Sequence, residues 1–334
     1  MKQALFSALI HCCPAWIFIR ILPLLQRIVP PSSKYEDMLL ARFARHYALH
    51  EEAVLKRIQR NNRFMRIREG RFPYAFFNIC FLNNVIGLMV YALYRGCLPL
   101  VEIKNQQEGE NIWEWYFEQP FALSDGAQSV ICDRSYTDYR PNIRTGFGGD
   151  DPDFKTWSFF YRRFVRFRAP VWDYIRQEID EAGVRENSLG LLIRGTDYTA
   201  SKPKGHPIQP DVEELIQKAA EYHNQYSYSA IYVTTEEERL FRRISEALGP
   251  DLVRENRRSY YDKQFYQQGM QFIGDVKFDR ENDNYWKGLE YLSSLVILSN
   301  CTDLVAGNCG GTEFAALYSS GFRNKYIFNK GLYS

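Results

Sequence analysis

The stretch LGLLIRGTDYTASKPKGHPIQP, residues 189–210, sets the architecture, because an apolar run passes abruptly into charge, glycine and proline. An apolar run such as residues 189–193 predicts a strand that is buried on both faces, as in a parallel sheet. Arg194 and Asp197 stand where that strand ends. Because an unpaired buried charge is costly, the two side chains either pair with each other or bind a ligand.

Strand and helix patterns alternate from this run to the C-terminus. Apolar runs predict strands at 189–193, 230–234, 251–254, 303–306 and 326–328. Helical periodicity predicts helices at 211–222, 236–247, 285–299 and 312–320. This alternation indicates parallel strands joined by right-handed crossovers, and therefore a doubly wound sheet.

The first half of the chain predicts a second α/β unit. Residues 72–80 and 98–103 have the pattern of strands, with FLNNVIG (81–87) as a loop and 88–96 as a helix between them. Residues 158–183 predict an amphipathic helical stretch that is interrupted at Pro170.

The segment before this unit, residues 34–70, predicts basic helices. We therefore expect an α/β protein with two Rossmann-like domains that face each other across a cleft. The expected parts are a helical N-terminal segment (1–70), an acceptor-side domain (71–170) and a nucleotide-sugar domain (171–334).

Composition indicates an ordinary globular protein, with 334 residues of which 46% are apolar and 25% charged. A formal net charge of +2 argues against nucleic acid as the main partner. Seven cysteines without disulfide-framework or zinc-site spacing indicate a reducing compartment, and we expect a cytoplasmic protein.

Residues 1–31 are the one segment that suggests a membrane. A spanning helix needs about 20 mostly apolar residues, and His11, Pro14 and Arg20 interrupt this stretch. It also lacks a convincing cleavage site for a signal peptide. Two alternatives stay open: a helix with Arg20 and Arg27 that lies at the inner face of a membrane, and a helix packed on the protein's own surface.

Polar residues follow three of the predicted strands in the second half. In a parallel sheet these positions share one edge, where ligands bind outside the carboxyl ends of the strands. The three groups are Arg194, Thr196 and Asp197; Thr234, Thr235 and Glu236; and GNCGGTE, residues 307–313.

The third group has the features of an anion-binding site. Gly307, Gly310 and Gly311 allow close backbone approach, and the helix that follows begins with free N–H groups. The fork of Arg194 suits two oxygens of a diphosphate. The alternative is a structural ion pair beside a tight turn, but the coincidence of three groups favours a ligand.

Four segments resemble the motifs of the fucosyltransferase superfamily, over roughly residues 72–330. LIRGTDY (192–198) resembles its His-x-Arg-Arg-x-Asp motif, and IYVTTEEERLF (231–241) is similar to its strand that ends in Ala-Thr-Asp-Asp. LSNCTDLVAGNCGGTEFAALYSSG (298–321) is similar to the late donor-binding turn, and CFLNNVIGLMVYALYRGCLPLVEI (80–103) resembles the opening Gly-Asn loop, helix and strand.

The resemblance implies a GT-B architecture, a GDP-sugar donor, and inverting transfer without a metal or other cofactor. Arg194 would grip the β-phosphate of the donor. The expected donor-binding residues are Asn84, Thr196, Thr235, Glu236, Asn308, Gly310, Gly311 and Thr312.

This sequence departs from the family motifs at several positions. Leu192 stands in place of the motif's histidine and Gly195 in place of a frequent second arginine. Glu236 and Glu237 replace the aspartates, and two glycines replace the usual serines in the late turn. Anion binding by backbone N–H groups survives the last change, whereas contacts from serine hydroxyls do not.

Transfer to a hydroxyl also needs a base. The candidates are Asp197, His206, Glu313 and the acidic residues 150, 151 and 153. Lys202 and Lys204 flank His206, which favours its neutral form. The Asp-x-Asp shape at 151–153 follows no buried strand, so we expect a solvated loop there and no metal site.

Three aromatic residues, Trp113, Trp115 and Tyr116, fit either an acceptor-sugar platform or core packing. The sequence as a whole favours an enzyme that transfers fucose from GDP-fucose to a glycan hydroxyl, in bacterial polysaccharide assembly. The alternatives are another nucleotide sugar on the same fold, and a binding protein without turnover.

Overall fold

The computed structural model describes residues 13–69, 77–105, 109–137, 139, 152–184, 186–270 and 272–334. The chain divides into two compact units. Unit 1 comprises Met1–Ala75, Cys80–Asn142 and Gly148–Arg166; unit 2 comprises Phe76–Ile79, Ile143–Phe147 and Phe167–Ser334. Parallel sheets with helices in both units confirm the predicted α/β class. The domain boundaries expected at 70 and 170 stay a prediction.

Unit 1 contains a three-stranded parallel sheet in the order β2-β1-β3. The strands are β1 (Arg63–Ile67), β2 (Leu98–Val101) and β3 (Gln128–Ile131). The central strand lies inside the stretch 34–70 that we expected to be helical, so that expectation is wrong for its last part. Phe64 and Ile67 of β1 are buried, and their apolar signal is masked in the sequence by the basic residues around them.

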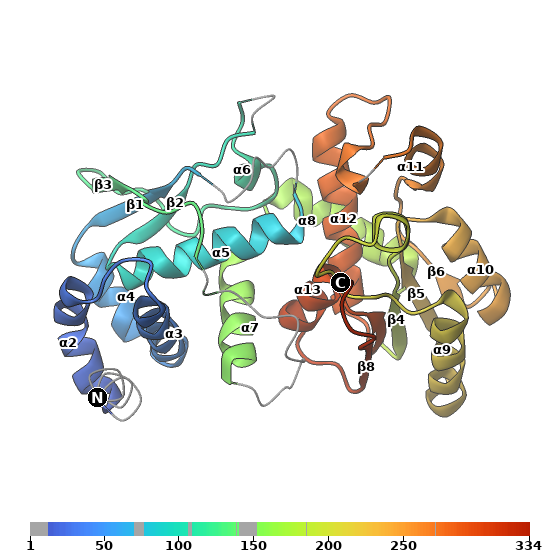
Figure 1. Cartoon of the computed structure of the whole chain (residues 1–334), viewed down its shortest axis with the longest axis horizontal. Helices are drawn as coiled ribbons and strands as arrows, with labels where there is room; N and C mark the ends of the chain where they lie inside the picture. The colour runs from blue at the N-terminus through green and yellow to red at the C-terminus, as the bar shows by residue number, and fades with distance from the viewer. Residues whose placement is uncertain are drawn as a thin grey trace. The chain divides into compact units, whose positions relative to one another are not determined.

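Helices α2 (Ala15–Ile28), α3 (Lys34–Leu49) and α4 (Glu51–Gln59) lie beside one another in unit 1 (Figure 1). Unit 1 also contains α6 (Ile112–Tyr116), α7 (Pro152–Phe164) and most of a further helix, α5 (Ile79–Tyr94). Ser33 caps α3 through a hydrogen bond from the Glu36 N–H. None of the helices in the described part of the chain has the length and apolar character needed to cross a bilayer.

Helix α5 (Ile79–Tyr94) corrects another expectation, because it includes residues 81–87, which we predicted to be a loop. The helix is buried from Phe81 onward, so its asparagines need partners inside the unit. Asn84 Nδ2 donates to the Ser135 carbonyl oxygen at 3.1 Å. Gly87 leaves room for Thr137, whose methyl carbon would lie 2.7 Å from a Cβ at residue 87. The strand expected at 72–80 falls mainly outside the described residues, and its last two residues belong to α5.

Unit 2 is built on a five-stranded parallel sheet in the order β6-β5-β4-β7-β8, which confirms the predicted doubly wound sheet. The order reverses between β4 and β7, and this is the topological switch point of the sheet. The strands are β4 (Ser188–Leu192), β5 (Ala230–Thr234), β6 (Val253–Arg254), β7 (Asp303–Gly307) and β8 (Lys325–Phe328).

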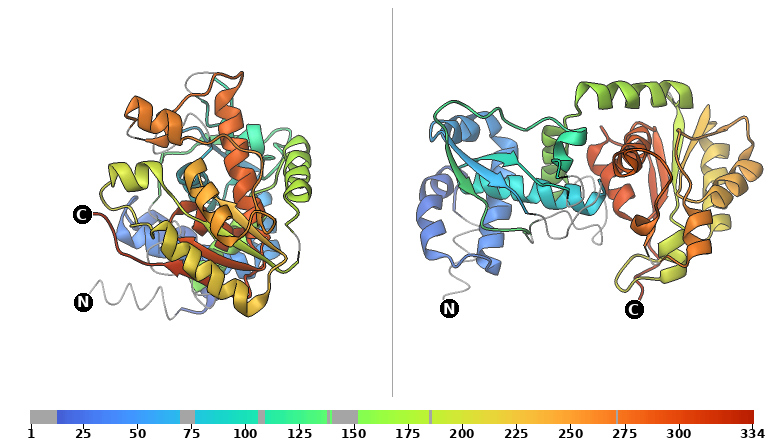
Figure 2. Two further views of the ribbon diagram at one scale, coloured as in Figure 1. Left: turned by 90° about the vertical axis from the view of Figure 1, so that its right-hand side faces the viewer. Right: turned by 90° about the horizontal axis from the view of Figure 1, so that it is seen from above.

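Helices cover both faces of this sheet (Figure 2). Leu189 and Leu191 of β4 pack in the core that includes side chains of α9 and α10. Gly190 faces α12 on the other side, where a Cβ would lie 2.6 Å from the Leu298 side chain. The helices of this unit are α8 (Ala169–Ala182), α9 (Val212–Tyr226), α10 (Glu238–Leu248), α11 (Asp262–Gln268), α12 (Asp283–Ser299) and α13 (Gly310–Tyr318).

Pro170 occupies the first turn of α8, where a missing N–H removes no helical hydrogen bond. Helix α7 ends at Phe164 and α8 begins at Ala169, so the predicted interruption near Pro170 is confirmed.

Candidate functional site

The chain turns sharply where β4 ends, and we call residues 194–201 the β4 turn. Thr196 has φ +34°, a left-handed value that is rare for a β-branched residue, and residues 197–201 form one π-helical turn. Gly195 is required by packing, because a Cβ there would lie 2.3 Å from Glu237 Oε1. The carboxylate of Glu237 therefore fills the space that a second arginine of the family motif would need.

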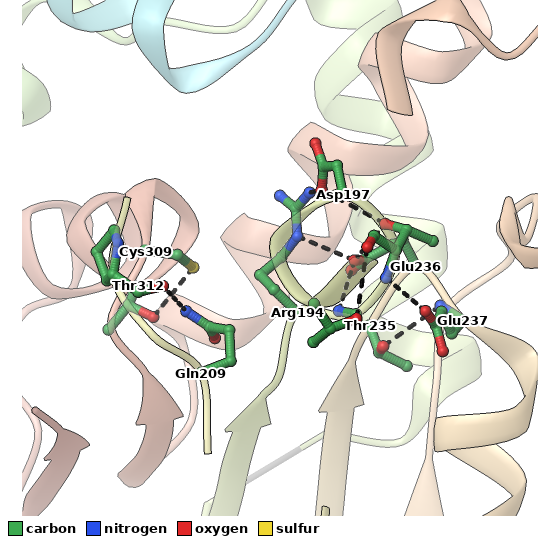
Figure 3. A network of polar contacts seen from close by, with 12 residues as sticks. Arg194, Asp197, Gln209, Thr235, Glu236, Glu237, Cys309 and Thr312 are labelled. Atoms are coloured by element: carbon green, nitrogen blue, oxygen red, sulfur yellow. Dashed lines mark hydrogen bonds and ion pairs between the residues drawn. The ribbon is translucent and has the colours of Figure 1, made fainter. Parts of the chain in front are cut away.

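Arg194 lies among acidic side chains at this turn (Figure 3). Its Nη2 donates to Asp197 Oδ1 at 2.9 Å, and its Nε lies 3.1 Å from Glu236 Oε1 in an ion pair without hydrogen-bond geometry. The guanidinium rests over the ring of Tyr198, 4.8 Å from its centroid. Burial acts to lower the pKa of Arg194, but Glu236 and Asp197 outweigh it and raise that pKa well above its ordinary value.

Two glutamates at the end of β5 hold the β4 turn. Glu236 Oε1 accepts hydrogen bonds from the Gly195 N–H at 2.7 Å and from Thr196 Oγ1 at 2.9 Å. Burial raises the pKa of Glu236, although the charge of Arg194 opposes the rise. Glu237 is fully buried and accepts from the Thr196 N–H and from the Tyr266 hydroxyl. Together the two carboxylates stabilise a strained backbone.

Thr235 contributes its backbone to a contact with a second arginine, the half-buried Arg258. The Thr235 carbonyl oxygen accepts from Arg258 Nη1 at 2.8 Å, and the Thr235 hydroxyl accepts from the Glu237 N–H. Thr235 is buried, so its hydroxyl is not exposed to a ligand. Its role in binding the sugar donor stays a prediction.

The turn after β7, residues 307–312, is here called the β7 turn, and it is built from small residues. Thr312 Oγ1 donates to the Gly307 carbonyl oxygen at 2.6 Å, and Cys309 Sγ lies 3.5 Å from the same hydroxyl. Gln209 Nε2 donates to the Asn308 carbonyl oxygen at 2.8 Å (Figure 3). This contact joins the loop after the β4 turn to the start of α13.

The two turns flank the switch point between β4 and β7. Tyr291 of α12 is near both, since it interacts electrostatically with Arg194 and its hydroxyl lies 3.4 Å from the position of a Cβ at Gly311. Burial raises the pKa of the Cys309 thiol, and the nearby charge of Arg194 acts against this rise. A cation and a helix N-terminus therefore meet at one edge of the sheet, which is an arrangement suited to an anionic ligand.

Two buried side-chain amide oxygens in this region accept no hydrogen bond from the described residues. The side-chain oxygens of Gln209 and Asn308 are buried, and neither has a hydrogen-bond partner among the described residues. The sequence did not identify Gln209 as a candidate site residue. It also did not identify Tyr198, whose ring lies under the Arg194 guanidinium. Tyr198 stands inside the quoted motif, and Gln209 lies between Pro207 and Pro210, so a polar residue between two prolines was the available signal.

The structure separates the candidate bases. Asp197 is 8% exposed and already pairs with Arg194, and Glu313 is 1% exposed inside the first turn of α13. His206 is exposed, and its ring centroid lies 5.3 Å from that of Tyr198. Tyr198 thus contacts both the candidate cation and the candidate base. Residues 150 and 151 lie outside the described residues.

The expected acceptor platform is wrong for two of its three residues. Trp113 and Tyr116 are fully buried, so neither ring offers a face to a sugar. Trp113 Nε1 donates to the Glu118 carbonyl oxygen at 2.9 Å, whereas the half-buried Trp115 donates from Nε1 to Glu110 Oε2 at 2.6 Å. Core packing, the alternative at the outset, describes Trp113 and Tyr116.

Asn84 belongs to a helix and not to the loop from which we inferred a donor contact. It is 6% exposed, and its Oδ1 has no hydrogen-bond partner in the part of unit 1 that the structure describes. Its donor-binding role stays a prediction.

Asp153, from the Asp-x-Asp shape, forms an ion pair with Arg45 at 2.8 Å. Across the described ranges, no three His, Cys, Asp or Glu side chains gather in a way that could hold a metal ion.

Comparison with known proteins finds similarity among solved structures alone. No family model and no curated protein matches the sequence. Among solved structures, the chain is similar to NodZ alpha-1,6-fucosyltransferase soaked with GDP-fucose, with 13% identity and a TM-score of 0.46 over 77% of this chain and 92% of that one. It is also similar to POFUT1 in complex with GDP-fucose, with 11% identity and a TM-score of 0.38 over 83% and 78% of the two chains. A further match is fucosyltransferase NodZ from Bradyrhizobium, with 13% identity and a TM-score of 0.43 over 76% and 91%.

Proposed function

We propose that this chain is an inverting, metal-independent glycosyltransferase that moves fucose from GDP-fucose to a hydroxyl of a glycan. One observation carries the proposal: Arg194 and the N-terminus of α13 lie on the two sides of the switch point in the sheet of unit 2. Ligands of doubly wound sheets bind at this position. The motif resemblance of residues 192–198 and 298–321 supports a GDP-sugar as that ligand.

The reaction would be a single displacement at the anomeric carbon of fucose. The acceptor oxygen forms a bond to this carbon while the bond to the β-phosphate oxygen of GDP breaks, and the electron pair leaves with GDP. Attack from the face opposite the leaving group inverts the configuration. Arg194 and the amides of α13 would stabilise the negative charge that develops on the leaving diphosphate.

The proton of the acceptor hydroxyl needs a place to go, and we assign it to His206. Its imidazole is exposed, whereas the competing carboxylate of Glu313 is buried. Tyr198 contacts both His206 and Arg194, so the base would lie on the same side of the turn as the diphosphate. A neutral imidazole can accept a proton near neutral pH.

A second candidate is a nucleotide-binding protein without turnover, and one observation favours it. Asp197 and Glu236 both pair with Arg194, so a diphosphate would have to compete with two carboxylates for one guanidinium. An assay of GDP-fucose hydrolysis and transfer separates the two candidates, because a silent protein binds the nucleotide and releases it unchanged.

The test of donor choice is a thermal-stability titration of the full chain with GDP, UDP, ADP and CMP, with and without a chelator. A ligand stabilises the folded chain according to its affinity. We expect GDP to raise the melting temperature most, with the same shift in both conditions. A shift that appears only with added Mn²⁺ or Mg²⁺ contradicts metal independence, and a larger shift with UDP points to another nucleotide sugar.

A further inference from the structure

Helix α2 has a buried face and an exposed face among the residues that the structure describes. Phe18, Leu22 and Leu25 are between 1% and 5% exposed and bury one side of the helix. Leu24 and Ile28 are 60% and 65% exposed. Because each residue turns a helix by about 100°, Leu24 points away from the buried side chains, and Ile28 lies at the flank of the buried face.

The exposed face of α2 also carries positive charge. Arg20 and Arg27 are exposed, and helical spacing places them in the same arc as Leu24 and Ile28. No acidic residue occurs in α2. We call the arc formed by Arg20, Leu24, Arg27 and Ile28 the outer face of α2.

Helix α4 adds basic residues beside α2. Arg57 Nη1 donates to the Ile19 carbonyl oxygen at 3.2 Å, which brings α4 against α2 (Figure 1). Arg57 and its neighbours Lys56 and Arg60 are exposed. Helix α4 therefore adds exposed cationic side chains near the N-terminal half of α2.

We propose that the outer face of α2 binds the surface of an anionic phospholipid bilayer, with the helix lying in the plane of the interface. Exposed apolar side chains next to arginines are the pattern of interfacial helices, which insert their apolar side chains between headgroups. Arginine and lysine near an anionic leaflet add attraction that falls off within a Debye length.

Charge decides between a bilayer and a second copy of the chain. A two-fold interface is self-complementary, so the outer face of α2 would meet the same face of its partner. The arginines of one copy, Arg20 and Arg27, would then approach those of the other, and like charges at such contacts are unfavourable. An anionic bilayer complements the same residues.

The experiment is co-sedimentation of the full chain with vesicles. We expect binding to vesicles of phosphatidylcholine that contain phosphatidylserine, weaker binding to phosphatidylcholine alone, and loss of binding at high salt. Leu24→Ser with Ile28→Ser should weaken binding at least roughly tenfold, because two apolar side chains no longer leave water. Arg27→Gln should weaken it about fivefold.

The matched control is Leu49→Ser, which removes a side chain that is 77% exposed at the end of α3 and lies off the outer face of α2. It should bind vesicles as the wild type does. Unchanged melting temperatures of all variants establish that they fold, since none of the replaced side chains is buried.

Two results overturn the proposal. One is a wild-type chain that ignores phosphatidylserine vesicles. The other is a Leu24→Ser, Ile28→Ser variant that binds them as well as the wild type does. The outer face of α2 is instead assigned to a second copy of the chain if the wild type binds no vesicles, sediments as a dimer, and becomes a monomer in the Leu24→Ser, Ile28→Ser variant. The nucleotide titration is independent of all three results, so failure here leaves the proposed transferase activity untouched.

Discussion

The β4 turn and the β7 turn lie at the same edge of one sheet, yet they are built in different ways. The β4 turn relies on charged side chains. Arg194 pairs with Asp197 inside the turn and with Glu236 after β5, and Glu237 holds the strained backbone of the turn. The β7 turn relies on small residues and backbone groups, with the Thr312 hydroxyl bonded to the Gly307 carbonyl oxygen.

The contrast indicates which kind of substitution should destabilise each turn. Substitutions in the β4 turn change charge and leave buried carboxylates without partners, which is costly. Substitutions in the β7 turn change shape and remove single neutral hydrogen bonds, which are each worth about 1 kcal/mol. Four predictions test the contrast.

The largest expected effect is on turnover, from Arg194→Lys. Lysine keeps the charge but loses the planar fork, so the variant should fold and lose roughly a hundredfold or more in rate, or about 2.7–4 kcal/mol of transition-state stabilisation. The measurements are the rate of fucose transfer and the free energy of unfolding.

Arg323→Lys is its control, because Arg323 pairs with the buried Asp303 at the start of β7, far along the strand from the β7 turn. It should leave the transfer rate unchanged. Near wild-type turnover in Arg194→Lys would instead mark Arg194 as one half of a structural ion pair.

The second prediction compares alanine at two glycines. Gly195→Ala should cost about 3 kcal/mol of unfolding free energy, because its Cβ meets the carboxylate of Glu237, which is held on two sides. Gly310→Ala should cost about 1 kcal/mol, since its Cβ lies 3.1 Å from the Ile79 side chain, which can yield slightly. Urea unfolding of both variants checks the order.

Glu237→Ala supplies the matching double-mutant cycle. If the clash with Glu237 causes the loss, Gly195→Ala should cost less in the Glu237→Ala background than in the wild type. Equal costs in both backgrounds would locate the strain elsewhere in the β4 turn.

The third prediction concerns a single hydroxyl of the β7 turn. Thr312→Val removes the donor to the Gly307 carbonyl oxygen in a buried site, and should cost about 1–2 kcal/mol of unfolding free energy. Thr312→Ser retains the hydroxyl and should cost less. A serine variant as unstable as the valine variant would show that the methyl group, and not the hydrogen bond, stabilises this turn.

The smallest expected effect is a dependence on pH. Burial raises the pKa of Glu236, so the folded chain holds this proton more tightly than the unfolded chain does. Wild-type stability relative to Glu236→Gln should therefore fall as pH rises from the ordinary glutamate range through the folded pKa, and stay level above it. The effect is small because Arg194 offsets part of the burial. Urea unfolding of both chains over a series of pH values measures it.

Asp303→Asn tests the opposite sign in the same unit. Burial alone would raise the pKa of Asp303, but hydrogen bonds from Arg323 and Tyr228 hold it below its ordinary value. Its contribution to stability is present above the ordinary aspartate pKa and is lost as pH falls through the folded pKa. Two variants with the same sign of pH dependence would contradict one of these assignments.

The sequence was a good guide to unit 2 and a poorer one to unit 1, for physical reasons. Strands such as β4 and β7 are buried on both faces and read as continuous apolar runs, so their edge and its polar residues could be predicted. In β1 the arginines at 63 and 66 hide a central strand in a basic stretch. In α5 two adjacent asparagines resemble a loop, because their burial depends on partners distant in sequence.

The side-chain network of the site was predictable only in part. The motif drew attention to Arg194 and Asp197, three residues apart, and they do pair. The contacts of Gln209 with Asn308 and of Tyr266 with Glu237 join segments separated by long stretches of chain, and local patterns carry no signal for them.

Unit 2 includes residues 76–79, which precede its main segment in the chain. This segment affects whether unit 2 can be expressed alone. Phe77 is fully buried and packs against Tyr291, and Ile79 lies beside Gly310 at the start of α13. A recombinant fragment that begins at residue 167 would lack both side chains and leave apolar surface open next to the β7 turn. We expect such a fragment to be poorly soluble, and addition of a peptide that contains residues 76–79 to improve its yield.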